Sequence, residues 1–443
     1  MADMFGVYDA AQKKEEEERQ RRENGKRCWE YYLGKHDASL TTRQGQPDDN
    51  VVINLARYIV DKSATFLFGK DVGMELAEGE TTPEEEWLQD VWRANRKMSF
   101  LHNCAVEGGI FGHLFVKILP DDPETGLPRM VNIAPEYVTV TWDDEDISRV
   151  LRYRIEWATT DLAGRTIYRR QDMDNEGAAW YISNLIARAH GRWEQDPERP
   201  SVRWPYPWAP MVDCQNLPLP GAYYGLSDLA DLALQDTVNY VASKINRILR
   251  YHAHPKTVAK GMGSGDIRVT EDEVLVLPGE AAELYNLEMQ SDLSAALAFF
   301  DRMRTEMLEV SRTPRVDPAT VNIGALSGFA LRVLHGDLLE KTETKRRLYG
   351  DLLIELNRRL LDLNGYGSDN YTTLHWQDPL PVDEAAEQQR DAFELDYNLV
   401  SHETVQRRRE LDPEIENERM GAEEVAEGNV GAALMREFVR GGE

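Results

Sequence analysis

The stretch from Gly225 to Leu363 constrains the fold most, because its residue patterns predict long helices around one small insert. The predicted elements are a helix over 226–252, a strand-like insert over 256–287, a helix over 291–311, a proline-broken loop and a helix over 329–363. A chain that places about 140 residues in this arrangement suits a tube or a stalk better than a catalytic pocket. We therefore interpret the chain as a subunit of a ring.

One face of the first predicted helix is apolar. Apolar residues that recur at spacings of four and three lie on one stripe of an α-helix. The stripe consists of Leu234, Val238, Val241, Ile245 and Ile248, with the first four as the expected packing residues of the stem. We expect an isolated subunit to expose part of this stripe between 234 and 248, so Val241→Asp should weaken assembly more than it harms folding.

The charged residues of the same helix match its dipole. Ser227 is expected to cap the first turn, and Asp228 and Asp231 lie near the positive end. Arg247 and Arg250 lie near the negative end. Both ends therefore favour a helix over this range.

The insert over 256–287 changes to the alternating period of strands and turns at a glycine-rich loop. Its second half is acidic and contains no Lys or Arg from 270 to 288. The acidic residues include Glu271, Asp272, Glu273, Glu280 and Glu283. Repeated around a ring, they would create a strongly negative partner surface. The alternative is an ordinary solvated hairpin.

The loop after the second helix contains Pro314 and Pro318, which do not fit a regular helix. The third helix has a polar middle, EKTETKRR at 340–347, which would either bridge two layers or face a wet channel. Bends are expected at Gly336 and Gly350, since glycine weakens helix interiors.

The first half of the chain combines helices with strands. The segment KKEEEERQRREN at 13–24 predicts a solvated helix or a mobile arm, and a helix over 51–68 should end at Gly69. A further helix should be capped by Thr82. From His113 to about 215 the alternating pattern predicts an antiparallel β region, to which TTLHWQD at 372–378 would return.

Composition bounds the function. The net charge is -27 and the three cysteines are far apart, which suggests neither a disulfide framework nor a zinc site. The chain shows no signal-peptide pattern and no apolar run long enough for a membrane span. It also contains no phosphate-binding loop, no nucleophile elbow and no HExxH motif, so we expect no catalytic site, no cofactor and no metal. The acidic tip at 143–146 lacks the glycine and the final glutamate of an EF-hand loop.

The order of these parts resembles the portal, or head-to-tail connector, proteins of tailed bacteriophages of the siphophage type. Four stretches carry the resemblance: NLARYIVDKSATFLFGKDVGMEL at 54–76, YGLSDLADLALQDTVNYVASKINRI at 224–248, SGFALRVLHGDLLEKTETKRRLYGDLLIELNRRLL at 327–361 and, more weakly, LVSHETVQRRRELDPEIENERM at 399–420. A negative channel wall would also suit DNA that has to slide rather than stay bound.

The resemblance implies an α+β fold: a portal-type ring subunit with long stem helices, a small α/β clip, a β-rich wing and a helical crown. The implied divisions are an N-terminal arm at 1–48, the wing at 49–225, the first stem helix at 226–255, the clip at 256–288, the second stem helix at 289–311, the tunnel loop at 312–327, a kinked helix with a returning wing strand at 328–382 and the crown with the C-terminal tail at 383–443.

The resemblance also implies the function. Such proteins form rings, usually of twelve copies, through which double-stranded DNA passes during packaging and ejection. Implied partners are the large terminase subunit, head-tail adaptors, and capsid and scaffold proteins, with the protein in the virion and, during assembly, in the host cytoplasm. The tunnel-loop candidates for DNA contact are Arg312, Arg315, Asp317, Thr320 and Asn322. The alternatives are another phage structural or scaffold protein and an acidic cytosolic hydrolase.

Overall fold

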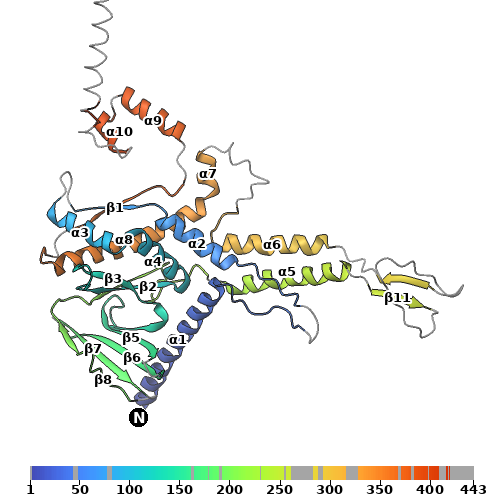
Figure 1. Cartoon of the computed structure of the whole chain (residues 1–443), viewed down its shortest axis with the longest axis horizontal. Helices are drawn as coiled ribbons and strands as arrows, with labels where there is room; N and C mark the ends of the chain where they lie inside the picture. Colours follow the sequence, from blue (N-terminus) through green and yellow to red (C-terminus); the bar gives the residue numbers. More distant parts are fainter. Residues whose placement is uncertain are drawn as a thin grey trace, which may run out of the picture. The chain divides into compact units, whose positions relative to one another are not determined.

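The computed structural model describes residues 2–42, 48–76, 82–160, 164–177, 179–188, 192–229, 231–253, 256–260, 283–287, 293–315, 328–367, 371–380, 384–397, 399–408, 416–417 and 419. The chain forms two compact units. The first comprises Met1–Val321 and Leu334–Pro379, and the second comprises Asn322–Val333 and Leu380–Glu443. Helices and strands both contribute, so the mixed α+β class expected from the sequence is correct (Figure 1).

In the first unit, helices occur along the chain before, between and after the strands. They are α1 (Ala2–Tyr32), α2 (Leu55–Phe68), α3 (Pro83–Ala94), α4 (Lys97–Phe111), the short 3-10 helix η1 (Pro135–Tyr137), α5 (Leu232–Ala253), α6 (Ser294–Val310) and α8 (Gly336–Leu363). Local signals account for their ends. The Thr82 hydroxyl accepts a hydrogen bond from the Glu85 amide at 3.3 Å with Pro83 in the first turn, and α2 ends before Gly69, as predicted.

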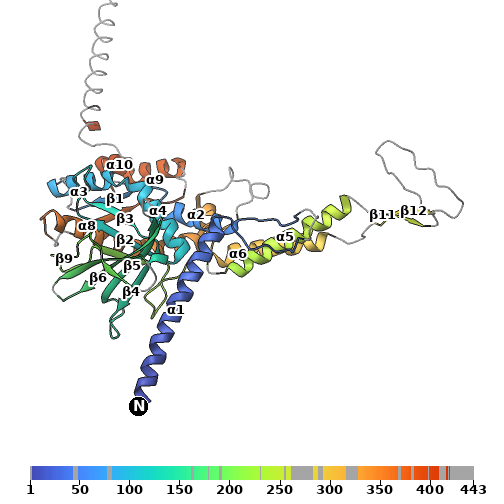
Figure 2. The ribbon, with the colours of Figure 1, turned by 60° about the horizontal axis from the view of Figure 1, so that its bottom comes forward.

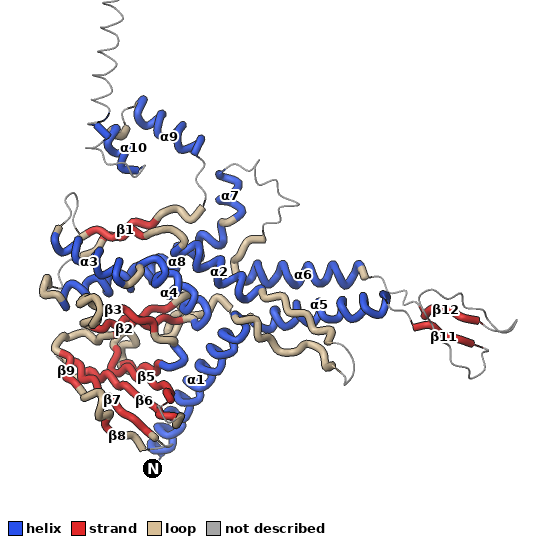
Figure 3. The backbone as a smooth tube through the Cα atoms, in the orientation of Figure 1, coloured by secondary structure: helices blue, strands red, loops and turns tan. Residues whose placement is uncertain are grey.

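The strands between residues 113 and 215 pair in antiparallel fashion, as their alternating pattern predicted. One sheet has the order β4-β5-β6-β7-β8 with β9 beside β7, and a second has the order β10-β2-β3 (Figure 3). Their bounds are β2 (His113–Leu119), β3 (Arg129–Asn132), β4 (Val138–Trp142), β5 (Val150–Thr160), β6 (Thr166–Asn175), β7 (Trp180–Ala187), β8 (Glu194–Gln195), β9 (Val202–Trp204) and β10 (Met211–Gln215).

The late strand β13 (Thr373–Trp376) does not return to this region, which corrects the sequence expectation. It pairs antiparallel with β1 (Val72–Glu75), just after α2, in a separate two-stranded sheet. Leu374 and Trp376 pack beside the core that α8 forms with α2, α3 and α4. The packing of β13 beside α8 therefore accounts for its pairing with β1. The position of α8 in the fold cannot be read from the local sequence of β13.

Helices α5 and α6 run side by side, and the insert between them in the chain includes the antiparallel strands β11 (Lys256–Lys260) and β12 (Glu283–Leu287) (Figure 2). The predicted third helix is divided at His335 into α7 (Gly328–Leu334) and α8, so a break occurs at the predicted bend beside Gly336. At the second predicted bend helix α8 continues without a break through Gly350, where an added Cβ would make an ordinary contact of 3.5 Å with the Leu374 side chain.

The second unit contributes α9 (Glu384–Asp396) and α10 (His402–Arg408) in addition to most of α7. The ring centroids of Phe393, in the last turn of α9, and Tyr397, directly after α9, lie 4.5 Å apart. Among the described helices, none combines the length and apolar character needed to cross a membrane.

Candidate functional site

The apolar stripe of α5 packs inside its own subunit. Val238 is fully buried in a core with α2 and α6 residues such as Ile59 and Met307, and Leu234 lies against the same core. Val241 and Ile245 are also buried. Leu234 and Ile248 stay partly exposed, so the isolated subunit exposes part of the stripe, whereas Val238, Val241 and Ile245 are buried.

A second, polar row on α5 binds the backbone of a segment far away in sequence. We call residues 48–54 the strap. The Ser243 hydroxyl accepts from the Val51 amide at 2.9 Å, and the Asn239 side chain accepts from the Ile53 amide at 3.0 Å. The Gln235 side chain accepts from the first two amides of α2, each at 3.1 Å, and so caps that helix.

The arginines at the end of α5 also bind the strap. One carboxylate oxygen of Asp49 lies 2.9 Å from the Arg247 guanidinium and 2.8 Å from that of Arg250. Asp49 is buried, so this charge depends on its two partners. The sequence assigned both arginines to the helix dipole, whereas the structure shows a specific ion pair with a distant residue.

The segment before α5 is not a helical turn, which corrects the predicted cap. Helix α5 begins at Leu232, and Asp231 accepts a hydrogen bond from the Leu234 amide at 3.3 Å, as a capping residue would. The Ser227 hydroxyl instead lies 2.8 Å from the carbonyl oxygen of Gly109 on α4, and Asp228 is completely buried. Asp228 therefore cannot serve as a solvated residue of a first helical turn.

Two lysines of α8 surround the Asp228 carboxylate. The Lys341 ammonium lies 3.0 Å from Oδ1 and the Lys345 ammonium lies 2.6 Å from Oδ2. We call these three residues the buried junction. Lys341 and Lys345 in the polar middle of the third helix are at most 3% exposed and connect α8 to the segment before α5 and to the end of α6, so this part bridges elements of the subunit. Glu340, Glu343 and Arg347 are exposed, and Arg346 is partly buried.

The surroundings of the junction shift the pKa values of its groups. Burial alone would raise the pKa of Asp228, but the ammonium groups of Lys345 and Lys341 lower it to about 2. Burial lowers the pKa of Lys345 to about 8, against the attraction of Asp228. Asn216 adds a hydrogen bond to Asp228 at 3.3 Å and accepts one from the Tyr349 hydroxyl at 3.1 Å.

Two glycines of α4 make room for these groups. A Cβ added to Gly108 would lie 1.9 Å from the Tyr349 hydroxyl, and one added to Gly109 would lie 2.9 Å from the Asp228 carboxylate. The two adjacent glycines inside a helix, where glycine costs stability, were the sequence signal that could have indicated a buried polar contact here.

The junction reaches the end of α6, where the predicted tunnel loop begins. The Lys341 ammonium donates to the carbonyl oxygen of Ser311 at 3.0 Å. The next residue, Arg312, has φ 57°, and the amides of Arg312 and Thr313 bond back to Glu309 and Leu308 at 2.9 and 2.8 Å. Such a pair of bonds closes a helix with one residue in the left-handed region.

The predicted tunnel-loop residues are placed only in part. Arg315 lies 3.6 Å from the Asp301 carboxylate of α6, and Arg312 forms the turn just described. Asp317, Thr320 and Asn322 lie outside the described residues. Of the predicted clip surface, Glu283 begins β12 opposite Lys260 of β11. The other four clip residues, Glu271, Asp272, Glu273 and Glu280, lie outside the description as well.

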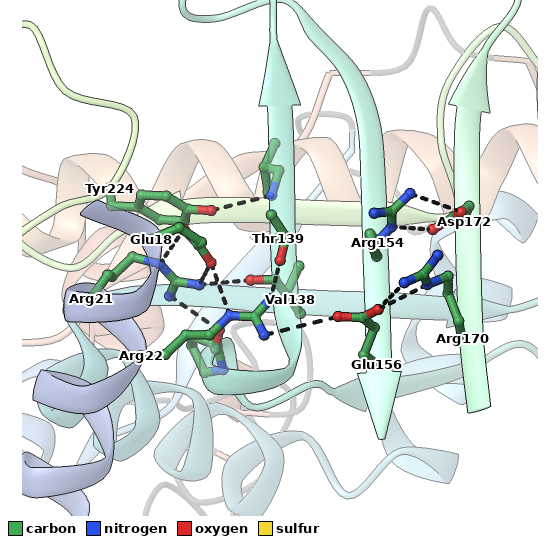
Figure 4. A network of polar contacts seen from close by, with 12 residues as sticks. Glu18, Arg21, Arg22, Val138, Thr139, Arg154, Glu156, Arg170, Asp172 and Tyr224 are labelled. Atoms are coloured by element: carbon green, nitrogen blue, oxygen red, sulfur yellow. Dashed lines mark hydrogen bonds and ion pairs between the residues drawn. The ribbon is translucent and has the colours of Figure 1, made fainter. Parts of the chain in front are cut away.

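Helix α1 is attached to the sheet that contains β4 and β5 rather than solvated on all sides. Figure 4 shows Arg21 and Arg22 reaching β4: Arg21 donates to the Val138 carbonyl at 2.7 Å and lies 4.2 Å above the ring of Tyr224, and Arg22 bonds to Thr139. Glu18 binds both arginines, at 2.6 Å from Arg21 and, one helical turn away, at 3.1 Å from Arg22. The interpretation as a mobile arm therefore fails for this part of α1.

Two places are candidates for acid-base chemistry: the surroundings of Asp213 on β10 and a hollow beside Trp87. Asp213 is largely buried and accepts from Tyr153 and Tyr223 at 2.6 and 2.5 Å, and His113 lies 2.9 Å away. These partners lower the pKa of Asp213 although burial opposes them. A hollow of about 410 Å³ beside Trp87 and Tyr206 has Asp121 as the one acidic residue in its lining. Neither place offers a pair of accessible carboxylates for hydrolysis.

No group of three or more potential metal ligands occurs among the residues that the structure describes. The acidic tip at 143–146 is occupied by side-chain pairs instead, with Asp143 3.7 Å from Arg149 and Asp144 3.1 Å from Lys14. The thiols of Cys28, Cys104 and Cys214 are unpaired, and burial raises the pKa of each.

The described features are those of a structural subunit built around paired helices, and comparison with known proteins identifies its family. The family described as "Phage portal protein, SPP1 Gp6-like" matches residues 11–426. The chain belongs to this family, and its role is that of a portal protein at the vertex of a phage capsid. Portal proteins are structural components of the virion and its head-to-tail connector.

Two solved structures are similar at low identity. One, titled "Virion of native gene transfer agent (GTA) particle", has 13% identity and a TM-score of 0.44, over 86% of this chain and 99% of that chain. The other, titled "Neck of empty GTA particle computed with C6 symmetry", has 14% identity and a TM-score of 0.46, over 84% and 95%. No curated protein matches the chain. The assignment therefore rests on the family match.

Proposed function

We propose that this chain assembles into a closed ring, of about twelve copies in the phage head, through which double-stranded DNA enters and leaves the capsid. The observation that carries the proposal is the family match over residues 11–426. The large terminase subunit and later the head-tail adaptors would bind the insert at 256–288. Capsid and scaffold proteins would surround the ring, which forms in the host cytoplasm.

The far ends of α5 and α6 supply apolar surface for contact with a second copy. Leu249 near the end of α5, and Leu297 and Phe299 near the start of α6, are each about half exposed. Leu297 and Phe299 differ by roughly 200° around the helix, so they lie on different sides. A head-to-tail ring needs two different surfaces on each subunit, and this helix pair provides them.

The proposed DNA contact is the segment at 312–327, with Arg312, Arg315, Asp317, Thr320 and Asn322 as candidates. A loop that meets sliding DNA needs a fixed root and weak contacts, since tightly bound phosphates would hold the duplex. The closed end of α6 and the bond from Lys341 to Ser311 provide such a root. Shortening 316–323 is expected to spare assembly and impair DNA passage.

The test of the ring is single-particle imaging of the purified protein together with native mass spectrometry. We expect a closed ring of about a dozen subunits around a channel that admits a duplex. A population that stays monomeric at all concentrations, also with capsid and scaffold proteins present, would contradict the proposal.

A further inference from the structure

The buried junction connects three parts of the chain that are distant in sequence. Asp228 lies in the segment that leads into α5, Ser311 closes α6, and Lys341 and Lys345 belong to α8. The carboxylate and both ammonium groups are buried, so water competes little for their bonds. The junction therefore fixes the start of one stem helix and the end of the other to α8.

The two lysines have different second partners. Lys341 donates to the Ser311 carbonyl oxygen at 3.0 Å, whereas Lys345 donates to the Ser63 hydroxyl of α2 at 2.8 Å. The last carbonyl groups of a helix lack partners within the helix, and a cation there is favourable to the helix dipole. Lys341 thus binds the residue directly before Arg312, and Lys345 does not.

We propose that Lys341 is a positioning residue for residues 312–315: it holds the root of the proposed DNA-contact segment in place relative to α8, and Asp228 holds Lys341. The inference rests on the proposed function, because only a segment that contacts DNA needs its first residues held in a fixed position. The charge balance at the buried junction allows the two lysines to have different roles, Lys341 toward Ser311 and Lys345 toward Ser63. Asp228 balances one ammonium, so a chain without Lys345 would still contain a neutral pair of Asp228 and Lys341.

The test compares Lys341→Met with Lys345→Met in the full-length protein. Each change removes one buried ammonium beside Asp228, and only the first removes the bond to Ser311. Hydrogen exchange is measured at the amides of Arg312 and Thr313, which close α6. We expect exchange there to be about tenfold faster in Lys341→Met and nearly unchanged in Lys345→Met, since a bond from a charged donor is lost.

Equal exchange in the two variants, or none above that of the unchanged protein, would overturn the inference. Tryptic cleavage after Arg312 and Arg315 gives a second reading of the same difference. If Lys341→Met does not fold, Lys341→Gln, which lacks the charge and the reach, is measured at the same two amides with the same expectation.

DNA packaging separates this inference from the proposed function. Faster exchange with reduced packaging in Lys341→Met supports both. Faster exchange with normal packaging supports the positioning role and contradicts the DNA contact at 312–327. Reduced packaging with unchanged exchange overturns the positioning role of Lys341.

Discussion

Asp228 has two buried ammonium groups as partners. Because of this environment, the loss of its single negative charge should lower the stability of the fold. The buried carboxylate lies between the two ammonium groups and supplies the opposite charge next to them. Its removal leaves two like charges together without water or a counter-charge. Residue type alone says nothing of this, because an aspartate before a helix is ordinarily a solvated capping residue.

Asp228→Asn is expected to lower the free energy of unfolding by about 3–5 kcal/mol, the usual cost of stranding buried charge. Urea unfolding followed by circular dichroism measures it. Asp231→Asn is the matched control, because Asp231 is exposed and asparagine can accept the same bond from the Leu234 amide. Similar losses in both variants would show that Asp228 is not bound to the lysines.

The lowered pKa of Lys345 predicts a pH dependence of stability. In the folded protein the pKa is about 8, below the ordinary value of 10.5, so the unfolded chain binds the proton more tightly. The penalty for the charged form, up to about 3 kcal/mol, is complete below pH 8 and disappears as the pH rises towards 10.5. Asp228, Lys341 and Cys214 are the neighbouring titratable groups that modify it.

The measurement compares the unchanged protein with Lys345→Met at several pH values between 7 and 11. The stability of the unchanged protein relative to the variant should increase over this interval. A constant difference, or one that decreases with pH, would mean that Lys345 keeps its ordinary pKa.

At the scale of elements, α5 shows that one helix can carry two buried faces of different chemistry. Leu234 and Val238 of its apolar stripe pack on α2 and α6, and the adjacent row of Gln235, Asn239 and Ser243 binds the strap. The spacing of that row is four residues, so the side chains stack along the helix and meet alternate amides of an extended chain. The strap thereby fixes α2 relative to α5.

Asn239→Ala is expected to destabilise the first unit by about 1–3 kcal/mol, because the partly buried Ile53 amide loses its acceptor. Hydrogen exchange at Ile53 should become faster, while exchange in β5 and β6 stays unchanged. Lys244→Ala on the exposed side of α5 is the control, with an expected change below about 0.5 kcal/mol. Unaltered protection of Ile53 in Asn239→Ala would argue against the strap contact.

At the scale of the whole molecule, the question is which apolar residues serve folding and which serve assembly. Val241 is buried within the subunit, so Val241→Asp should harm folding first, in contrast to what the helical pattern alone predicted. Leu297, near the start of α6, is about half exposed. An aspartate there adds a charge to the surface of the subunit without removing packing from the core.

Leu297→Asp is therefore expected to leave the melting temperature of the subunit within about 2 °C and to reduce ring formation at least tenfold. Native mass spectrometry counts the rings, and thermal unfolding followed by circular dichroism monitors the subunit. Val241→Asp is the comparison variant, which should lower the melting temperature of the subunit and also reduce ring formation. Normal rings from Leu297→Asp would remove this face of α6 from the proposed interface.

Much of the fold follows from local patterns. The cap at Thr82, the end of α2 at Gly69, the alternating strands after His113 and the break beside Gly336 each depend on residues within one turn or one strand of each other. Such signals act over a few residues, so the sequence alone suffices to place them.

The sequence by itself determined the class of protein, the order of its elements and the amphipathic character of α5. Only the tertiary structure decided which neighbour each polar group meets. Asp49 pairs with Arg247, β13 pairs with β1, and Asp228 pairs with Lys341 and Lys345. The partners in each case are a hundred residues or more apart in sequence. The physical reason is that burial turns a solvated charge into one that must be paired. The partner is fixed by packing between elements, which local sequence does not record.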